Sequence, residues 1–239
     1  MATRAPKGLR ILGWILRTLG TLIVFGVAGV MVWRLASSGD PSGVKSLLPN
    51  EPLCAAYETY GNDLILRYQD QYGITRAEHN AGYFSVTRYV FIPQADQVQL
   101  VFRYNNSTLL HLKEDYGLDS VPPKSGTYFD VTLVKTTDLT PDDKNDNLDP
   151  ATLSMERVFP TGEPLRVQTG FYTYFRYTFD GVTVDDLTDG VYVDIYYTED
   201  LDYSKDAYGT LCIYAYDSEW FSLSLSSAEK KALAAYGKD

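Results

Sequence analysis

The chain has 239 residues, 45% of them hydrophobic, and a formal net charge of −10. The first 36 residues hold five cations and no acids, so the remainder carries 16 cations against 31 acids, a net charge of −15. A domain this acidic repels nucleic acid and anionic lipid. We therefore expect no nucleic-acid partner, and the apolar content is ample for a sizeable folded core.

One apolar stretch near the N-terminus, 11–35, determines the expected cellular location of the rest of the chain. Crossing a bilayer core of about 30 Å takes about 20 mostly apolar residues in a helix, and Ile11 to Trp33 supplies 23 with one charge inside, Arg17. Arg17 lies less than two turns from Ile11, so its side chain can reach the interface. Trp14 and Trp33 fall near the two ends, where indoles prefer the headgroup layer. The stretch predicts a single transmembrane anchor.

The flanking cations predict an orientation. Arg34 and Lys45 follow the apolar run, whereas four cations lie on its N-terminal side: Arg4, Lys7, Arg10 and Arg17. The positive-inside rule then puts the N-terminus in the cytoplasm and the C-terminal domain outside. We expect a single-pass cell-membrane protein with an extracytoplasmic domain.

Two other interpretations of 11–35 stay open. A cleaved signal peptide also has a positive start and an apolar run, and Ala36-Ser37-Ser38 is a tolerable cleavage site. A buried helix in the core of a soluble protein is the second. The length of the run and its basic flank favour the uncleaved anchor over both.

After the anchor come short runs rich in Tyr, Phe, Val, Ile and Thr, separated by turn residues, a pattern typical of strands. We predict nine strands, at 63–69, 83–92, 97–104, 128–135, 153–159, 164–168, 170–179, 191–198 and 209–216. Polar and apolar residues alternate within them; Val98, Leu100 and Phe102 share one face. One polar face per strand indicates antiparallel sheets half covered by core. The predicted fold class is mostly β, an antiparallel β-sandwich of Ig-like architecture between a transmembrane helix and a short C-terminal helix.

The C-terminal helix is predicted over 227–236, because Ser226 and Glu229 form a capping box before it. The Ser/Gly/Pro-rich stretch between the anchor and the strands has the composition of a flexible tether. The chain is thus divided into a basic cytoplasmic N-terminus (1–10), a transmembrane anchor (11–35), a flexible tether (36–52), an extracytoplasmic β-sandwich (53–225) and a short C-terminal helix and tail (226–239).

Two cysteines, Cys54 and Cys212, lie near the two ends of the predicted ectodomain. An extracytoplasmic location permits a disulfide between them. Such a bond would close a loop of about 158 residues and stabilise the fold by several kcal/mol. Two unpaired small hydrophobic residues are the alternative.

No motif for catalysis or cofactor binding occurs. The sequence has no G-x-S-x-G, H-E-x-x-H, C-x-x-C or Gly-rich phosphate loop, and its two histidines, His79 and His111, fall in turn or loop contexts. We therefore expect no cofactor and, on balance, no enzyme. One acid-rich loop offers candidate calcium ligands, although it lacks the glycine and final glutamate of an EF-hand; they are Asp142, Asp143, Asp146 and Asp149.

Tyrosine is the most informative residue type, with 20 in the chain. If the strands at 170–179, 191–198 and 209–216 are neighbours, their outward positions form one face, because alternate residues of a strand share a side. Tyrosine and arginine are enriched at interfaces. We predict a partner-binding face made of Tyr172, Tyr174, Arg176, Tyr192, Asp194, Tyr196, Tyr214 and Tyr216. Aromatic pairing within the sheet, or cover by a helix or loop, is the alternative.

These features predict a non-catalytic, membrane-anchored binding or assembly module of the cell envelope, whose partner is another envelope protein or a glycan. Two other functions stay open. An envelope hydrolase acting on glycan or peptide through paired carboxylates would need a deep cleft in which two acids converge. A structural accessory subunit of a membrane complex would make its contact through the helix.

Overall fold

The computed structural model describes residues 7–36, 41–70, 83–136, 155–189, 191–213 and 221–238. The chain divides into two compact units, Met1–Gly39 and Asp40–Asp239. The first unit contains one helix, α1 (Lys7–Ala36). Its stretch Trp14–Trp33 is long and apolar enough to cross a membrane by length and composition, and none of it is buried. The prediction of one apolar N-terminal helix fit to be a single-pass anchor is confirmed to that extent.

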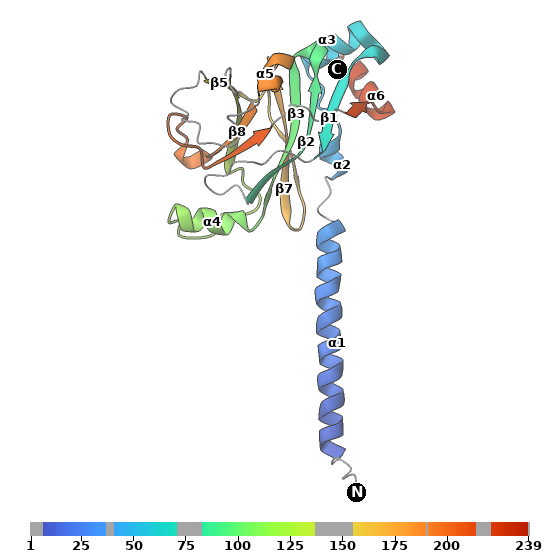
Figure 1. Ribbon diagram of the computed structural model, residues 1–239, viewed down its shortest axis with the longest axis vertical. Helices are drawn as coiled ribbons and strands as arrows, with labels where there is room; N and C mark the ends of the chain where they lie inside the picture. The colour runs from blue at the N-terminus through green and yellow to red at the C-terminus, as the bar shows by residue number, and fades with distance from the viewer. Residues whose placement is uncertain are drawn as a thin grey trace. The chain divides into compact units, whose positions relative to one another are not determined.

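The second unit is built on two antiparallel sheets (Figure 1). Sheet A contains, in spatial order, β10 (Phe221–Leu223), β1 (Leu66–Asp70), β2 (Phe84–Ile92), β3 (Gln97–Asn105), β7 (Tyr172–Asp180) and β6 (Leu165–Gln168). Sheet B contains β5 (Met155–Val158), β4 (Phe129–Thr136), β8 (Val191–Tyr197) and β9 (Gly209–Ile213). The nine predicted strands are confirmed to within a few residues of their ends, and β10 is an addition.

One hydrophobic core joins the two sheets, because alternate residues of their strands point toward each other. Phe129 of β4 in sheet B meets rings from sheet A: its centroid lies 5.0 Å from Phe84 of β2 and 5.0 Å from Tyr104 of β3. Both contacts are edge-to-face, an arrangement that aromatic rings prefer. The alternation seen in the sequence is therefore the pattern of this shared core.

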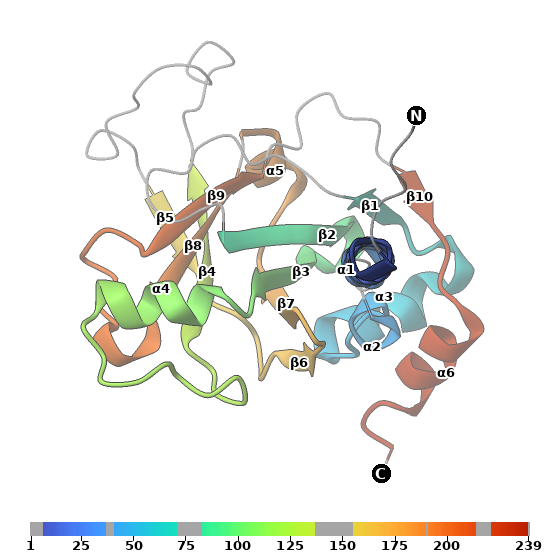
Figure 2. The same ribbon diagram turned by 90° about the horizontal axis from the view of Figure 1, so that it is seen from below.

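Three helices lie on the opposite face of sheet A, and Figure 2 shows them grouped there: α2 (Ser42–Lys45), α3 (Glu51–Tyr60) and α6 (Ser227–Ala235). Leu53 of α3 and Leu233 of α6 form a second core cluster with Val90 of β2. The remaining short helices are η1 (Gly61–Asp63), η3 (Pro93–Ala95), α4 (Thr108–Asp115), α5 (Val184–Asp189) and η6 (Thr198–Asp200).

The C-terminal helix α6 begins at the predicted capping box. The Ser226 hydroxyl accepts from the Glu229 N–H at 3.2 Å, and Glu229 Oε2 accepts from the Ser226 N–H at 2.8 Å. Helix α3 is an addition to the prediction. Its start has a readable signal: Asn50 at the N-cap accepts from the Leu53 N–H, and Glu51 and Pro52 fill the first turn.

Residues 41–50, called the docked segment below, are packed on sheet A where the sequence predicts a flexible tether. Val44 is fully buried against Val101 and Tyr174, and Leu47 joins the cluster under α3 and α6. These two apolar side chains, three residues apart, explain why the Ser/Gly/Pro-rich stretch does not behave as a free spacer.

Side chains hold the docked segment by its main-chain atoms. Arg176 Nη1 donates to Val44 O at 3.0 Å. Gln99 pairs with Leu48 in both directions, its Oε1 accepting from the Leu48 N–H and its Nε2 donating to Leu48 O, each at 2.8 Å. Glu229 Oε1 accepts from the Leu47 N–H at 2.9 Å. The segment is therefore fastened to the middle of sheet A and to α6 together.

The Glu229 carboxylate should make stability depend on pH. Burial opposes its ionisation, but hydrogen bonds from Leu47 and Ser226 and the charge of Arg176 outweigh this and hold the pKa below its ordinary value. A depressed folded-state pKa means that the ionised group stabilises the fold above the unfolded pKa, and that this contribution is lost as pH falls through the folded pKa. We expect Glu229→Gln to lose about 1–2 kcal/mol at pH 7, and the difference from wild type to shrink below about pH 4.

Urea unfolding of both proteins over a pH series measures this difference. The exposed Glu58 on α3 supplies a matched control, because Glu58→Gln removes the same charge without a described hydrogen bond. An undiminished Glu229→Gln difference in acid would contradict the assignment.

Candidate functional site

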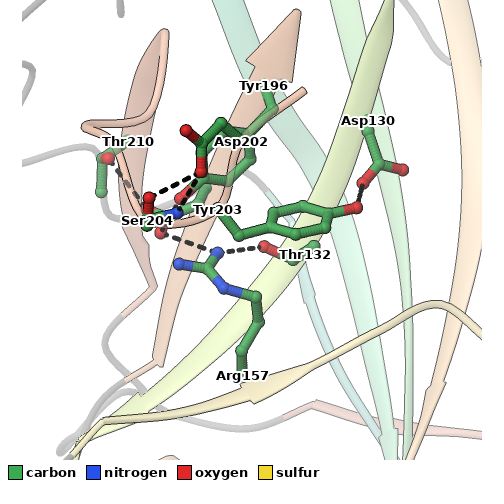
Figure 3. A network of polar contacts seen from close by, with 9 residues as sticks. Asp130, Thr132, Arg157, Tyr196, Asp202, Tyr203, Ser204 and Thr210 are labelled. Atoms are coloured by element: carbon green, nitrogen blue, oxygen red, sulfur yellow. Dashed lines mark hydrogen bonds and ion pairs between the residues drawn. The ribbon is translucent and has the colours of Figure 1, made fainter. Parts of the chain in front are cut away.

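The outer face of sheet B carries a network of polar and aromatic side chains (Figure 3). Its strands turn Val131 and Val193 into the core, so Thr132 and Asp194 point the other way. Thr132 lies opposite Asp194, and Asp194 lies opposite Thr210, which makes a row across three strands. The network contains Asp130, Thr132, Arg157, Asp194, Tyr196, Tyr203 and Thr210.

Arg157 of β5 is the centre of this network. Its Nη1 donates to Thr132 Oγ1 at 2.7 Å and to Asp194 Oδ2 at 3.2 Å. Its guanidinium also lies over two rings, 5.0 Å from the centroid of Tyr196 and 5.4 Å from that of Tyr203. The side chains of Arg157 and Asp194 are only 22% and 14% exposed, so the ion pair is well shielded from water and the cation–π contacts gain from that shielding.

Tyr203 reaches the same face from the loop after β8. Its hydroxyl donates to Asp130 Oδ2 at 2.6 Å, and its ring meets Tyr196 and Phe159 edge-on at 5.1 Å each. Burial, the bond to Asp130 and the charge of Asp130 raise the pKa of Tyr203 to about 12. The phenol therefore stays protonated at neutral pH and keeps its donor role.

The acidic side chains of this face are engaged within the network. Asp194 also accepts from Thr210 at 2.9 Å, and Asp130 accepts from Tyr203, so each carboxylate is engaged with protein donors. No group of three or more His, Cys, Asp or Glu able to hold a metal occurs among the described residues. Beside the network lies Phe159, a large apolar side chain that is 50% exposed. Phe159 and the partly exposed Arg157 and Tyr203 thus lie at the surface of this face, whereas Tyr196 is buried.

The predicted tyrosine face is divided by the topology. β8 and β9 are neighbours, but β7 lies in the other sheet between β3 and β6, so the premise that all three strands are neighbours is wrong. Tyr192, Asp194 and Tyr196 do share the outer face of sheet B. The other two predicted members on that side, Tyr214 and Tyr216, lie outside the described residues.

The β7 members of the predicted face lie on sheet A. Tyr174 and Arg176 are fully buried there by the docked segment, which is the cover by a loop that the sequence left open. Tyr172 is half-buried, and the Arg103 guanidinium lies 4.5 Å from its ring centroid. These residues pack within the domain, because the docked segment, which the sequence predicts as a tether, covers this part of sheet A.

The two cysteines are in different parts of the domain. Cys54 is free and buried on α3 over sheet A, while Cys212 belongs to β9 of sheet B, so no disulfide joins them in the structure. Burial, with the nearby charge of Glu58, raises the pKa of the Cys54 thiol, which keeps it in its unreactive form.

The remaining candidate groups divide between described and undescribed regions. His111 stacks on Tyr83 with ring centroids 4.2 Å apart, and its Nδ1 lies 3.8 Å from Glu114. The candidate metal ligands and the other histidine lie outside the described residues: Asp142, Asp143, Asp146, Asp149 and His79.

Sequence reasoning missed the centre of the network. Asp130 and Thr132 alternate with apolar residues in one predicted strand, 128–135, and Arg157 lies in another, 153–159. The alternation pattern does not reveal that β5 pairs with β4 and β4 with β8. These two pairings bring Arg157 to Asp194. Tyr203 carried no such signal, because it lies in a loop.

No family model matches the chain, and comparisons with curated protein sequences and with solved structures give no match either. Function is therefore argued from the chemistry of the site.

Proposed function

We propose that the chain is a non-catalytic, membrane-anchored, extracytoplasmic module that binds or assembles with another component of the cell envelope, a protein or a glycan. The observation that carries this proposal is the outer face of sheet B, where Arg157 lies against Tyr196 and Tyr203 with the half-exposed Phe159 beside them. Arginine and aromatic residues dominate the binding energy of protein interfaces.

The location follows from the charges around α1. Four cations on its N-terminal side against two after it support a cytoplasmic N-terminus. The domain that follows is then outside. Its two sheets, which share one core, support the assignment to the β-sandwich architecture of Ig-like extracytoplasmic modules.

A photo-reactive phenylalanine analogue at position 159 tests the proposed interface. We expect ultraviolet light to join the chain in intact cells to one discrete envelope protein or glycan. The same analogue at Val184, which is exposed on α5, is the matched control and should yield no such product. Adding Arg157→Gln to the position-159 chain should reduce the product severalfold, since hot-spot residues contribute about 2 kcal/mol or more. Equal products at 159 and 184 would contradict the proposal.

Replacing 11–35 with an unrelated anchor separates this function from that of a structural accessory subunit. The cross-link from position 159 persists after the swap if sheet B makes the contact. Its loss in a protein that is still inserted and folded would assign the contact to the helix instead.

A further inference from the structure

The outer face of sheet A holds the docked segment by its main chain. Side chains from two strands of sheet A, from β2 and from α6 bind peptide N–H or carbonyl groups within residues 44–48. They are Arg88, Gln99, Arg176 and Glu229. The Lys45 and Ser46 side chains, by contrast, are exposed and make no described contact. In peptide recognition, main-chain hydrogen bonds of this kind give affinity, whereas pockets for particular side chains give specificity.

Two aliphatic side chains of the docked segment fill such pockets. Val44 is fully buried against side chains of β3 and β7. Leu47, three residues later, is buried in the cluster under α3 and α6. Gly43 precedes the first of them, and a Cβ on it would lie 3.3 Å from Val167 of β6, so a small residue fits best there. The face thus selects a short motif, in which a small and an aliphatic residue are followed by two residues of any kind and a second aliphatic residue.

The side chains that bind the segment also hold one another in place. Arg176 Nε donates to Gln99 Oε1 at 3.2 Å, and Gln99 Nε2 donates to Gln97 Oε1 at 2.9 Å. Gln97 Nε2 in turn donates to Asp180 Oδ1 at 2.7 Å. These bonds join β3 to β7 and do not involve the docked segment. A segment from another chain would therefore meet the same donors and acceptors, already arranged to bind it.

The covalent attachment of the docked segment argues against its exchange with a second copy of the chain. Asn50 fixes its end, because Asn50 Oδ1 accepts from Gln97 Nε2 at 2.9 Å and from the Leu53 N–H at 3.2 Å. Only Pro49 lies between Leu48 and Asn50, and two residues span at most about 7 Å. Leu48 therefore cannot reach a second domain while Asn50 stays in its own. A segment of a different protein has no such restriction.

We propose that this part of sheet A is a peptide groove, in which a segment of a different protein with the same motif replaces residues 41–48. The groove consists of Arg88, Gln99, Val101, Tyr174, Arg176 and Glu229. The incoming segment makes the same kinds of contact as the docked one, so the two compete by their relative affinities. Replacement releases residues 41–48, which then lengthen the link to α1. The interaction uses the other sheet from the face in the proposed function and does not depend on that function.

A synthetic peptide of residues 41–50, labelled with a fluorophore at its N-terminus, tests the groove on the full chain in lipid nanodiscs. The docked segment competes with the peptide, so the apparent affinity is reduced by the fraction of chains whose groove is open. Val44→Ala in the chain removes buried methyl groups from this competitor alone. We expect it to tighten peptide binding on the order of tenfold, measured by fluorescence anisotropy. The same change in the peptide should weaken binding by a similar factor.

Two matched controls separate the groove from general loosening of the domain. Lys45→Ala in the peptide should leave binding unchanged, because that side chain is exposed in the docked segment. Val131→Ala in the chain removes the same groups from a fully buried position between the sheets, and should leave peptide binding at the wild-type level. Equal tightening by Val44→Ala and Val131→Ala would mean that the peptide binds loosened chains of any kind, and would overturn the groove.

Two other results would contradict the proposal. A Val44→Ala chain that is folded by circular dichroism but binds no peptide would show that the docked segment is a fixed part of the fold. A Val44→Ala chain that dimerises in detergent would show that a second copy fills the groove instead of a different protein. If Val44→Ala does not fold, Leu47→Val gives the same comparison, because it removes a single methylene group and should tighten peptide binding roughly fourfold.

Discussion

A domain that begins at residue 53 should be far less stable than one that begins at residue 41. The shorter chain loses Val44 and Leu47, both buried, and burying one such side chain contributes about 1.5–3 kcal/mol. It also loses the bond from Arg176 to Val44 O, and a hydrogen bond to a charged group contributes about 1.5–3 kcal/mol. A total loss of at least about 4 kcal/mol approaches the stability of a typical domain.

Urea unfolding of 41–239 and 53–239, followed by circular dichroism, measures this loss. Lys45→Ala in the longer chain is the matched control, because its exposed side chain makes no described contact and the substitution should change stability by no more than about 0.5 kcal/mol. Coincident unfolding curves for the two lengths would mean that residues 41–52 are a tether after all.

Truncating Phe129 should be the most damaging single substitution between the sheets. Its ring is almost completely buried and meets Phe84, Tyr104 and Tyr208. Removing a buried phenylalanine costs about 3–5 kcal/mol, because the lost contacts leave a cavity that neighbours only partly fill. In a domain of about 200 residues this corresponds to a fall in Tm of roughly 10 °C.

Differential scanning calorimetry of Phe129→Ala beside Phe159→Ala checks this expectation. The second ring is half-exposed on the outer face of sheet B, so its loss should cost no more than about 1 kcal/mol. Similar Tm values for the two variants would show that Phe129 does not join the sheets.

The strands could be predicted because each is long enough to show its period. β3 alternates over nine residues and buries one side in the shared core, and alternation of this kind is a local property of the sequence. β10 has three residues, too few to show a period. Helix α3 is not predicted, because the stretch before it has the composition of a spacer. Asn50 and Pro52 nevertheless mark a helix start.

The candidate site was harder to predict, because alternation assigns a side chain to a face without saying which strand lies beside it. Tyr192 and Asp194 were correctly placed together on one strand. Arg176 was added to them on the assumption that β7 is a neighbour, whereas β7 pairs with β3 and β6 in the other sheet. Arg157 comes from a four-residue strand whose position depends on pairing with β4. Such pairings are long-range contacts that a single sequence does not encode locally.

The contacts of the docked segment also determine when it can pack during synthesis of the chain. Arg176 follows its acceptor Val44 by 132 residues, and Glu229 follows Leu47 by 182. At a synthesis rate of about 5–20 residues per second, Glu229 leaves the ribosome roughly 10–40 s after Leu47. The nascent domain therefore spends that interval attached to α1 by an undocked chain, and its first residues settle only after its last helix has been made.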